Sequence, residues 1–595
     1  MSDRQVQNLE SFSKTYGFIR YFYPSRELQN FDWDRFLMHG VEKILRNENE
    51  AMEALLHRLF SPICPEIVFS KNEIILTENT IQSPFYIQEH RAIGEFATLF
   101  LGNDYTPIRR IEESENRLQF YLYQLQENLF VKFPLAVKEL RPRTSEFRNL
   151  ERELRAVEMR GVRLWHLISR RSQRNANIAL HQYVFRIADM IGRWQMIHNF
   201  YAYYEEDGLS STWNKHNKEA LRAVASSKNI HEHYDAILRL FANIRDSHVF
   251  IAPNITFGGL IGSFIQSFYP ELQIGFVDGI GYIANAGAYS EKLQRGDVIK
   301  MVNNIPIDEF VAKRLNYIAY STRAGGFVRL SRDLFRSYHR NSVFTIQVEK
   351  ADGSRKELQI TTNRTRPYFE SPTSDFIKTY ENGIIYINLT SPSATYENFS
   401  RRIADFQQAE GIILDVRGRP HDESLAILSH FITDVVSLGN LLRPIISFPN
   451  RKNRQYVEVE KWRIAPATSD FSREFSQKYQ YPTPLPIAID VPVVFLTNAS
   501  AGSFAETFME IVKHYRIGTI IGEPTAGCNG DIARIRRPFA IYTFSFNRFK
   551  NRDGSRFHGV GVQPDILSVP TLSDIRLGID TQLQRAKIYL YENRK

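Results

Sequence analysis

The chain has 595 residues, of which 43% are hydrophobic and 24% are charged, a composition typical of a soluble protein of several domains. Its 75 lysines and arginines outnumber its 66 aspartates and glutamates, but arginine is locally dense only in residues 141–174, where glutamates are interspersed. That pattern favours a solvated helix face, and because no nucleic-acid-binding motif accompanies it, we expect no nucleic-acid partner. The only cysteines, Cys64 and Cys528, exclude a disulfide framework and a zinc cluster.

The N-terminal residues contain no apolar core of the kind that a signal peptide needs, and no later stretch approaches the about 20 apolar residues of a membrane span. We therefore expect no membrane span. The sequence does not decide the compartment. It is the cytoplasm or, if a signal was removed before residue 1, a location outside the cytoplasm. The sequence does not specify an oligomeric state.

Aromatic-rich helical patterns cover residues 8–60 and recur at 187–241. Both stretches end in Arg-Leu-Phe, which predicts a duplicated helical unit. Only the second copy continues into a Ser-His pair, Ser247 and His248.

The stretch between the copies, residues 65–186, begins with a strand-like piece, Glu66–Thr77, and continues in long charged patterns of helical type. We expect an N-terminal helical domain over 1–186 and the second helical repeat over 187–254. Nothing in 65–186 indicates a function.

From about residue 255 the hydrophobic period changes to that of strands. Alternating runs at 344–349 and 358–361, joined across Ala-Asp-Gly, predict a hairpin. Gly-Asp-Val-Ile at 296–299, followed by Asn-Asn-Ile-Pro, resembles a PDZ domain, a module that binds extended peptide ends at a sheet edge. We expect a PDZ-like β domain over 255–365.

Residues 375–595 alternate between strand and helix patterns, which predicts an α/β domain with a central sheet. A buried strand at 492–497 leads through small residues into a helical pattern that begins at Ser503. The first N–H groups and the positive dipole end of that helix favour a negative charge developing on an oxyanion. A serine that only caps the helix is the alternative interpretation.

Four motifs carry most of the functional signal. They are Arg-Asp-Ser-His at 245–248, Ala-Gly-Ser-Phe-Ala-Glu at 501–506, Gly-Glu-Pro-Thr at 522–525 and Gly-Val-Gln-Pro-Asp at 561–565. With the PDZ-like segment, they resemble the C-terminal processing (tail-specific) peptidases and their tricorn-core relatives over about residues 187–570. The resemblance implies a multidomain α+β protein with a ClpP/crotonase-like α/β core, serine-type endopeptidase activity on protein or peptide substrates, and no metal or organic cofactor.

The family divides by its catalytic base. In the tail-specific branch a lysine shortly after Gly-Glu-Pro-Thr takes the proton of the serine, but this chain has Cys528 there. In the tricorn-like branch the base is a histidine preceded by a serine, which matches Ser247 and His248. The resemblance therefore implies Ser503 as nucleophile, His248 as base and Ser247 as a supporting hydroxyl. Histidine suits the role because its unperturbed pKa of about 6.5 is close to the operating pH. Helix capping is the alternative role of Ser247 and His248.

The chain departs from the tricorn-like pattern where a glutamate is expected shortly before the last motif, because it has Phe-His-Gly there. The residue that orients His248 could then be His558, Glu506 or Asp531, and a purely structural role is the alternative for His558.

A second departure follows Asp-Val-Arg-Gly at 415–418, where the family often continues Asn-Pro-Gly-Gly and this chain has Arg-Pro-His-Asp. A backbone N–H donor does not require glycine. The resemblance therefore still implies an oxyanion hole built from the backbone of Gly502, Phe504, Gly418 and His421.

These departures motivate an alternative from another class, a catalytically inactive peptide-binding scaffold on the same fold. The related interphotoreceptor retinoid-binding proteins make an apolar-ligand carrier a third alternative. Acyl-CoA chemistry of the crotonase type is disfavoured by the PDZ-like insertion.

Overall fold

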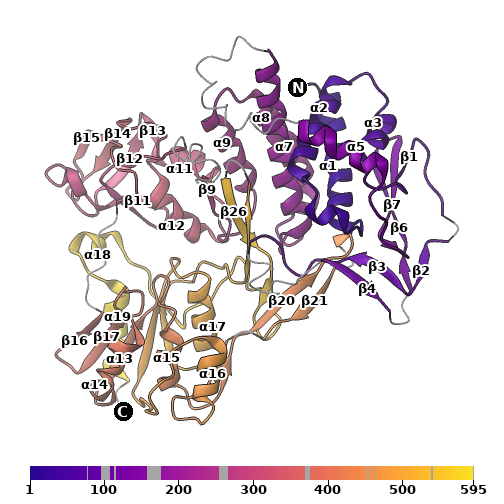
Figure 1. Cartoon of the computed structure of the whole chain (residues 1–595). Coiled ribbons are helices and arrows are strands. Elements are labelled where there is room, and N and C mark those ends of the chain that lie inside the picture. The colour runs from indigo at the N-terminus through magenta and orange to yellow at the C-terminus, as the bar shows by residue number, and fades with distance from the viewer. Residues whose placement is uncertain are drawn as a thin grey trace.

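The computed structural model describes residues 1–76, 78–95, 107–112, 116–156, 176–253, 265–368, 376–451, 454–460, 462–537 and 540–593. Figure 1 shows three bodies: N-terminal helices with small sheets, a middle unit of strands and two helices, and a C-terminal body built on a larger sheet. Within the described ranges, no helix combines the length and apolar composition needed to cross a membrane.

The two aromatic-rich stretches each fold into three α-helices that share one core. Their bounds are α1 (Asp3–Phe22), α2 (Trp33–Arg46), α3 (Met52–Phe60), α7 (Ala176–Phe200), α8 (Leu209–Ser226) and α9 (Ile230–Phe241), with the 3-10 turn η1 (Glu27–Asn30) before α2. Polar N-caps define several starts, because the side chains of Ser2, Asp32 and Asn229 accept hydrogen bonds from first-turn amides. The helical predictions for these stretches are confirmed.

Between these helices the chain forms short antiparallel strands, so the prediction of helices through most of 65–186 is wrong. The strands are β1 (Val68–Ser70), β2 (Thr80–Gln82), β3 (Phe85–Gln88), β4 (Ile108–Ile111), β5 (Asn116–Leu118), β6 (Phe120–Gln126), β7 (Leu129–Pro134) and β8 (Ala136–Val137). These strands are only two to seven residues long, too short for their alternation to stand out among the charged residues around them. In β7 only alternate residues reach the core, where Phe133 stacks on Phe18 at 5.5 Å between ring centroids. Helix α5 (Ser145–Ala156) follows, and residues 157–175 lie outside the described ranges.

The middle unit is a sheet of order β10-β11-β12-β14-β15, with β13 paired to β12. Its elements are β10 (Gln273–Val277), β11 (Ile280–Asn285), η3 (Gly287–Tyr289), β12 (Val298–Val302), β13 (Ile305–Pro306), α11 (Ile307–Leu315), α12 (Arg323–Asp333), β14 (Val343–Glu349) and β15 (Arg355–Thr361). The predicted hairpin is confirmed, with Ile346 opposite Leu358. Asp278 and Gly279 both adopt positive φ in the two-residue turn between β10 and β11, as such tight turns require.

The C-terminal body contains the predicted central sheet, of order β16-β17-β18-β23-β24-β28. The strands are β16 (Ile377–Thr379), β17 (Ile384–Asn388), β18 (Gly411–Asp415), β23 (Val493–Thr497), β24 (Thr519–Gly522) and β28 (Ile566–Leu567), parallel except for β16. Alternate residues face opposite sides: Ile412 and Leu414 pack under α17 (Phe504–Tyr515), whereas Ile413 packs against α19 (Thr581–Glu592).

Smaller elements complete this body. They are α13 (Tyr396–Ser400), α14 (Ile403–Gln407), α15 (Ser424–Leu428), η4 (Ser429–Phe431), β19 (Val436–Ser437), β20 (Asn440–Ile445), β21 (Gln455–Glu458), β22 (Arg463–Ile464), α16 (Ser472–Tyr479), β25 (Ile532–Arg536), β26 (Ala540–Ser545), β27 (Arg548–Lys550) and α18 (Leu572–Leu577). The helices predicted over 396–408 and 423–432 are each broken into two short turns.

A short strand joins the helices to the C-terminal body. The chain leaves α9 and forms β9 (Ile251–Pro253), which pairs antiparallel with β26. In Figure 1, β9 and β26 lie between the N-terminal helices and the large sheet. This pairing brings the segment that follows α9 to the C-terminal body.

Candidate active site

Ser503 lies at the turn between β23 and α17, in a backbone conformation that residues other than glycine rarely adopt (φ 56°, ψ −116°). Such a conformation costs about 1–3 kcal/mol and persists only where the surroundings hold it. Here the Ser503 N–H donates to the Cys528 carbonyl at 2.9 Å. The side chain is half-buried, at the N-terminal end of a helix whose first amides have no partners within the helix.

Glu506 fixes this turn from inside the protein. It is fully buried, and its carboxylate accepts hydrogen bonds from Thr525 Oγ1 (2.6 Å) and from the N–H groups of Gly527 (2.6 Å), Cys528 (2.8 Å) and Ser503 (3.2 Å). Burial raises the pKa of Glu506, and these donors oppose the rise. The carboxylate therefore joins the serine turn to the 525–528 loop. Its hydrogen bonds are made to these two segments and not to His248.

His248 is held by groups from two distant parts of the chain. Its Nδ1 lies 2.9 Å from Ser545 Oγ on β26 and 3.9 Å from Asp246 Oδ1. Asp246 is fully buried and accepts both the His248 N–H (2.8 Å) and the Ser545 N–H (2.8 Å). The other ring nitrogen, Nε2, is buried and has no hydrogen-bond partner among the described residues.

His248 and Ser503 line the same cavity of about 480 Å³. No hydrogen bond joins the two side chains in the described part of the chain. Apolar and aromatic groups form most of the wall, and charged groups from two loops stand beside them. The remaining lining residues are Arg419, Asp422, Leu425, Leu438, Leu441, Trp462, Tyr479, Gln480, Tyr481, Phe504, Thr507, Asn529, Gly530, Asp531 and Ile532.

The charge state of His248 follows from its burial. Burial lowers the pKa of His248, Arg329 and His558 lower it further, and Asp246 and Asp531 oppose the fall. The imidazole is therefore neutral at physiological pH. In the tautomer whose Nδ1–H donates to Ser545 Oγ, the Nε2 lone pair is free to accept a proton.

Ser247 is turned toward the middle unit. Its Oγ accepts from the Ser321 N–H at 2.9 Å, and its own N–H donates to Ser321 Oγ at 2.8 Å. It is not among the residues that line the cavity. These hydrogen bonds of Ser247 are thus made to Ser321 and not to His248 or Ser503.

Two of the four expected oxyanion donors are used elsewhere. The Gly418 N–H donates to the Val416 carbonyl at 2.8 Å, and the His421 N–H donates to the Leu389 carbonyl at 2.9 Å. Neither residue lines the cavity. The physical reason is that the loop after β18 satisfies these two amides itself, one within its own turn and one against the residue that follows β17.

The other donors lie at the serine turn. Phe504 is the first residue of α17 and lines the cavity, and Gly502 precedes the serine. A further donor, not predicted from the sequence, is Asn529 Nδ2, which is buried without a partner among the described residues and belongs to the same cavity wall. The Gly530 N–H donates to Asn529 Oδ1 at 2.8 Å, which fixes the orientation of the amide.

His558 and Asp531, two of the possible orienting residues, make other contacts. The His558 ring stacks on Tyr203 at 3.7 Å between centroids, and its Nε2 lies 3.3 Å from Asp207 Oδ1. Asp531 lines the cavity and accepts from Asn547 Nδ2 at 2.8 Å. Asp246 and Ser545, which contact His248 directly, were not predicted.

Sequence signals for these missed residues are weak. Asp246 lies in the Arg-Asp-Ser-His motif itself, so its proximity to His248 could have been considered. Ser545 has no local signal, because it reaches His248 only through the β9–β26 pairing. Within the described residues, no group of His, Cys, Asp and Glu side chains is arranged to hold a metal ion.

Comparison with known proteins places this site in a family context. Residues 383–568 match the sequence profile of peptidase family S41. The structure of mature CPAF complexed with lactacystin is 15% identical, with a TM-score of 0.52 over 69% of this chain and 97% of that chain. Mature CPAF alone is 16% identical, with a TM-score of 0.51 over 69% and 96%.

A more distant likeness is to the tricorn protease, at 16% identity and a TM-score of 0.34 over 88% of this chain and 46% of that chain. No curated protein matches by sequence. At these identities the likeness to the two CPAF structures concerns the fold alone.

Proposed function

We propose that the protein is a serine-type endopeptidase that cleaves protein or peptide substrates through an acyl-enzyme on Ser503, with His248 as base, because residues 383–568 match peptidase family S41. Serine peptidase chemistry follows from the family, and the roles of the individual residues are the proposal. The observation that carries it is the unpartnered, buried Nε2 of His248 in the cavity that Ser503 also lines.

In the proposed reaction, Ser503 Oγ attacks the carbonyl carbon of the scissile peptide bond while its proton moves to His248 Nε2. Collapse of the tetrahedral intermediate breaks the C–N bond, and His248 returns the proton to the leaving amine. A water molecule, deprotonated by the same nitrogen, then attacks the ester and releases Ser503. The substrate closes the gap between the two side chains, since catalytic hydrogen bonds are often absent before a substrate binds.

Asp246 and Ser545 are proposed as positioning residues for the base. Ser545 Oγ holds the Nδ1–H tautomer, which leaves Nε2 available to the serine proton. Asp246 binds the backbone on both sides of this contact and favours the imidazolium that forms during the reaction.

The proposed oxyanion hole consists of the Phe504 N–H, at the start of α17, and Asn529 Nδ2. Amides at a helix N-terminus favour negative charge, and a fixed donor in a site closed to water is worth roughly 3–4 kcal/mol of transition-state stabilisation. The Gly502 N–H is a third donor in this proposal.

The cavity walls favour an apolar side chain next to the scissile bond. Leu425, Leu438, Leu441 and Trp462 form one side of the space next to Ser503. Burial of a leucine- or phenylalanine-sized side chain there contributes about 1.5–3 kcal/mol of binding.

We further propose that the middle unit is a PDZ-type module, which carries the extended end of the substrate. A groove of about 740 Å³ lies between β10, an edge strand, and α12, with Phe276 and Phe327 in its walls. The same groove reaches Asn498 and Ser500, in the loop that leads to Ser503. A peptide added to β10 as a further strand would therefore point toward the catalytic turn.

The test is labelling with a serine-directed fluorophosphonate, with the adduct located by mass spectrometry. We expect an adduct on Ser503 that is lost in Ser503→Ala, and we expect Ser503 labelling to be slowed about 10²–10⁴-fold in His248→Ala. Circular dichroism spectra should show that both variants keep the fold. Absence of an adduct on folded wild-type protein between pH 5 and 9 would contradict the proposal and favour the inactive peptide-binding scaffold.

A further inference from the structure

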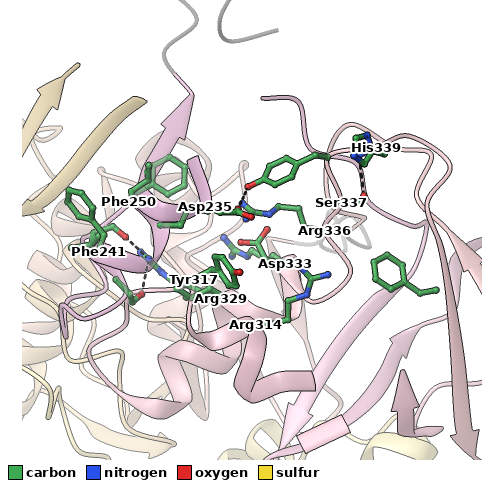
Figure 2. A pocket seen from close by; sticks show the side chains of 18 residues that line it. Asp235, Phe241, Phe250, Arg314, Tyr317, Arg329, Asp333, Arg336, Ser337 and His339 are labelled. Carbon is green, nitrogen blue, oxygen red and sulfur yellow. Dashed lines mark hydrogen bonds between the residues drawn. The ribbon is translucent and has the colours of Figure 1, made fainter. Parts of the chain in front are cut away.

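A second cavity, of about 450 Å³, lies between α9 and the helices of the middle unit (Figure 2). It is distinct from the cavity of Ser503 and from the groove beside β10, although α12 borders both the groove and this cavity. Four arginines and two aspartates line it: Arg314, Arg329, Arg332, Arg336, Asp235 and Asp333. The wall thus carries an excess of positive charge.

The two aspartates are occupied by tyrosine hydroxyls. Asp235 accepts from Tyr338 Oη at 2.5 Å, and Asp333 accepts from Tyr269 Oη at 3.5 Å. Neither forms an ion pair with an arginine of the cavity in the described part of the chain.

Arg314 and Arg336 are the arginines with unused capacity. In the described ranges, neither has a hydrogen bond or an ion pair to a carboxylate, and each lies instead against an aromatic ring: Arg314 over Phe310 (5.2 Å) and Arg336 over Tyr338 (5.5 Å). Burial lowers the pKa of Arg314 and the charge of Arg336 lowers it further, while Asp235 and Asp333 oppose the fall. Burial also acts to lower the pKa of Arg336, but Tyr338 and Asp333 raise it above its usual value. The two guanidinium groups repel each other and Asp333 compensates them only in part, so a further anion beside both is favoured.

The opposite wall is apolar. Phe241 and Leu238 of α9 and Phe250 line this wall. Phe241 and Leu238 are buried, whereas Phe250 is 62% exposed. Figure 2 shows Phe241 and Phe250 on one side of the space and Arg314, Asp333 and Arg336 on the other. An occupant that satisfies both walls has an anionic end and an apolar body.

We propose that this cavity is a binding site for an organic carboxylate, with the carboxylate between Arg314 and Arg336 and the apolar body along Phe250. A guanidinium pairs with a carboxylate through two parallel hydrogen bonds, and Asp235 and Asp333, which line the same cavity, limit the site to a small negative charge. The same chemistry occurs in a free arylalkanoic acid and in the C-terminus of a peptide that ends in an apolar residue.

Arg329 connects this site to the proposed base. Its guanidinium belongs to the cavity wall, and it donates to the carbonyls of Ser247, Val249 (2.6 Å) and Ala319 (3.0 Å). Two of these carbonyls lie on either side of His248. An anion in the cavity attracts Arg329 and therefore weakens its hydrogen bonds to the two carbonyls that flank His248. This coupling rests on the proposed peptidase function, whereas the binding site does not.

The binding test uses N-acetyl-L-phenylalanine as the probe in isothermal titration calorimetry with the full chain. Arg314→Gln and Arg336→Gln should each weaken binding by about tenfold or more, because each removes a charge-assisted hydrogen-bond pair. Lys313→Gln is the matched control: it removes a positive charge from α11 next to Arg314, but Lys313 is exposed and does not line the cavity. N-acetyl-phenylalaninamide, which lacks the carboxylate, should not bind.

Equal binding of the acid and the amide, or unchanged affinity in both arginine variants, would overturn the site. A hexapeptide with a free C-terminal phenylalanine distinguishes the sources. If it binds more tightly than the free acid, the natural ligand is a chain terminus, and if it binds more weakly, the ligand is a small acid.

The coupling is measured separately, as the fluorophosphonate labelling rate of Ser503 with and without saturating probe. We expect at least a twofold change that Arg336→Gln abolishes. Calorimetry on Ser503→Ala should still detect binding of the probe. A failure of Ser503 labelling would then contradict the peptidase proposal alone. A labelling rate that the probe does not change would contradict the coupling alone.

Discussion

Asp246 uses both of its carboxylate oxygens on the environment of His248. Oδ1 accepts the His248 N–H and Oδ2 accepts the Ser545 N–H, so one buried side chain fixes the histidine and the hydroxyl that faces its Nδ1. Because this buried carboxylate is the acceptor for two backbone N–H groups, a substitution of Asp246 would leave them without a partner and displace His248 and Ser545.

We predict that Asp246→Asn moves the acid limb of the Ser503 labelling rate to lower pH. His248 acts as a base only when neutral, and because burial lowers its pKa, the wild-type limb should lie below the usual value of about 6.5. The Asp246 charge raises the pKa of His248, so its removal lowers that pKa further. The measurement is the labelling rate between pH 4 and 9.

Asp531→Asn serves as the control, because Asp531 also raises the pKa of His248 but more weakly. Its limb should shift in the same direction by less. A slower rate in Asp246→Asn with an unmoved limb would mean that Asp246 acts on the fold alone.

Among the elements, α17 and the 525–528 loop behave as one piece because Glu506 links them. Thr525, Gly527 and Cys528 all donate to this carboxylate, and Ser503 shares it. These hydrogen bonds thus hold Ser503 at its unusual φ and offset the cost of that conformation.

Glu506→Gln should destabilise the protein by about 1–3 kcal/mol and slow labelling of Ser503, because an amide cannot accept at both ends and its NH₂ group would face backbone N–H donors. The measurements are urea unfolding and the labelling rate. Glu510→Gln, one turn further along α17, is the matched control. Burial raises the pKa of Glu510 to about 7, and Arg552 opposes this rise. About half of the Glu510 side chains are therefore already neutral at pH 7, and a neutral glutamine should cost less there. Equal effects of the two variants would contradict the special role of Glu506.

The sequence allowed prediction of β23, of α17 and of the hairpin between β14 and β15, because each has a strong local period and clear turn residues. It did not allow prediction of the strands between 68 and 137, whose short alternation is interrupted by charged residues. Partners that meet only through tertiary pairing, as Ser545 and His248 do across β9 and β26, leave no local pattern at all.

At the scale of the whole molecule, the helical body and the C-terminal body share buried polar contacts. Arg537, which follows β25, pairs with Asp34 of α2 (2.7 Å) and with Asp189 of α7 (3.3 Å). Arg193 pairs with the same Asp189 at 2.9 Å, with both side chains fully buried. Loss of one partner would leave a buried charge uncompensated, so these bodies are expected to unfold together.

We predict that the free energy of unfolding falls as the pH decreases from about 6.5 to 4. Burial lowers the pKa of His90 to about 4, whereas an unfolded histidine titrates near 6.5, so the unfolded chain binds the proton first. His90 alone accounts for about 3 kcal/mol of this loss. Urea unfolding at pH 7 and pH 4 measures it.

In His90→Gln the slope should decrease, while the amide can still donate to the Tyr21 carbonyl that His90 contacts at 2.9 Å. His57→Gln, at an exposed position of α3, should leave the slope unchanged. An identical slope in His90→Gln would mean that other groups control the acid limb of stability.

The β9–β26 pairing has a consequence for the newly made protein. Ser545 follows His248 by 297 residues, and Ser503 lies between them. At roughly 5–20 residues per second, the ribosome needs about 15–60 s to make this stretch. During that time His248 has been made but Ser545, which contacts its Nδ1, has not. In the proposed mechanism, the nascent chain therefore gains peptidase activity only once the last strands have been translated and docked.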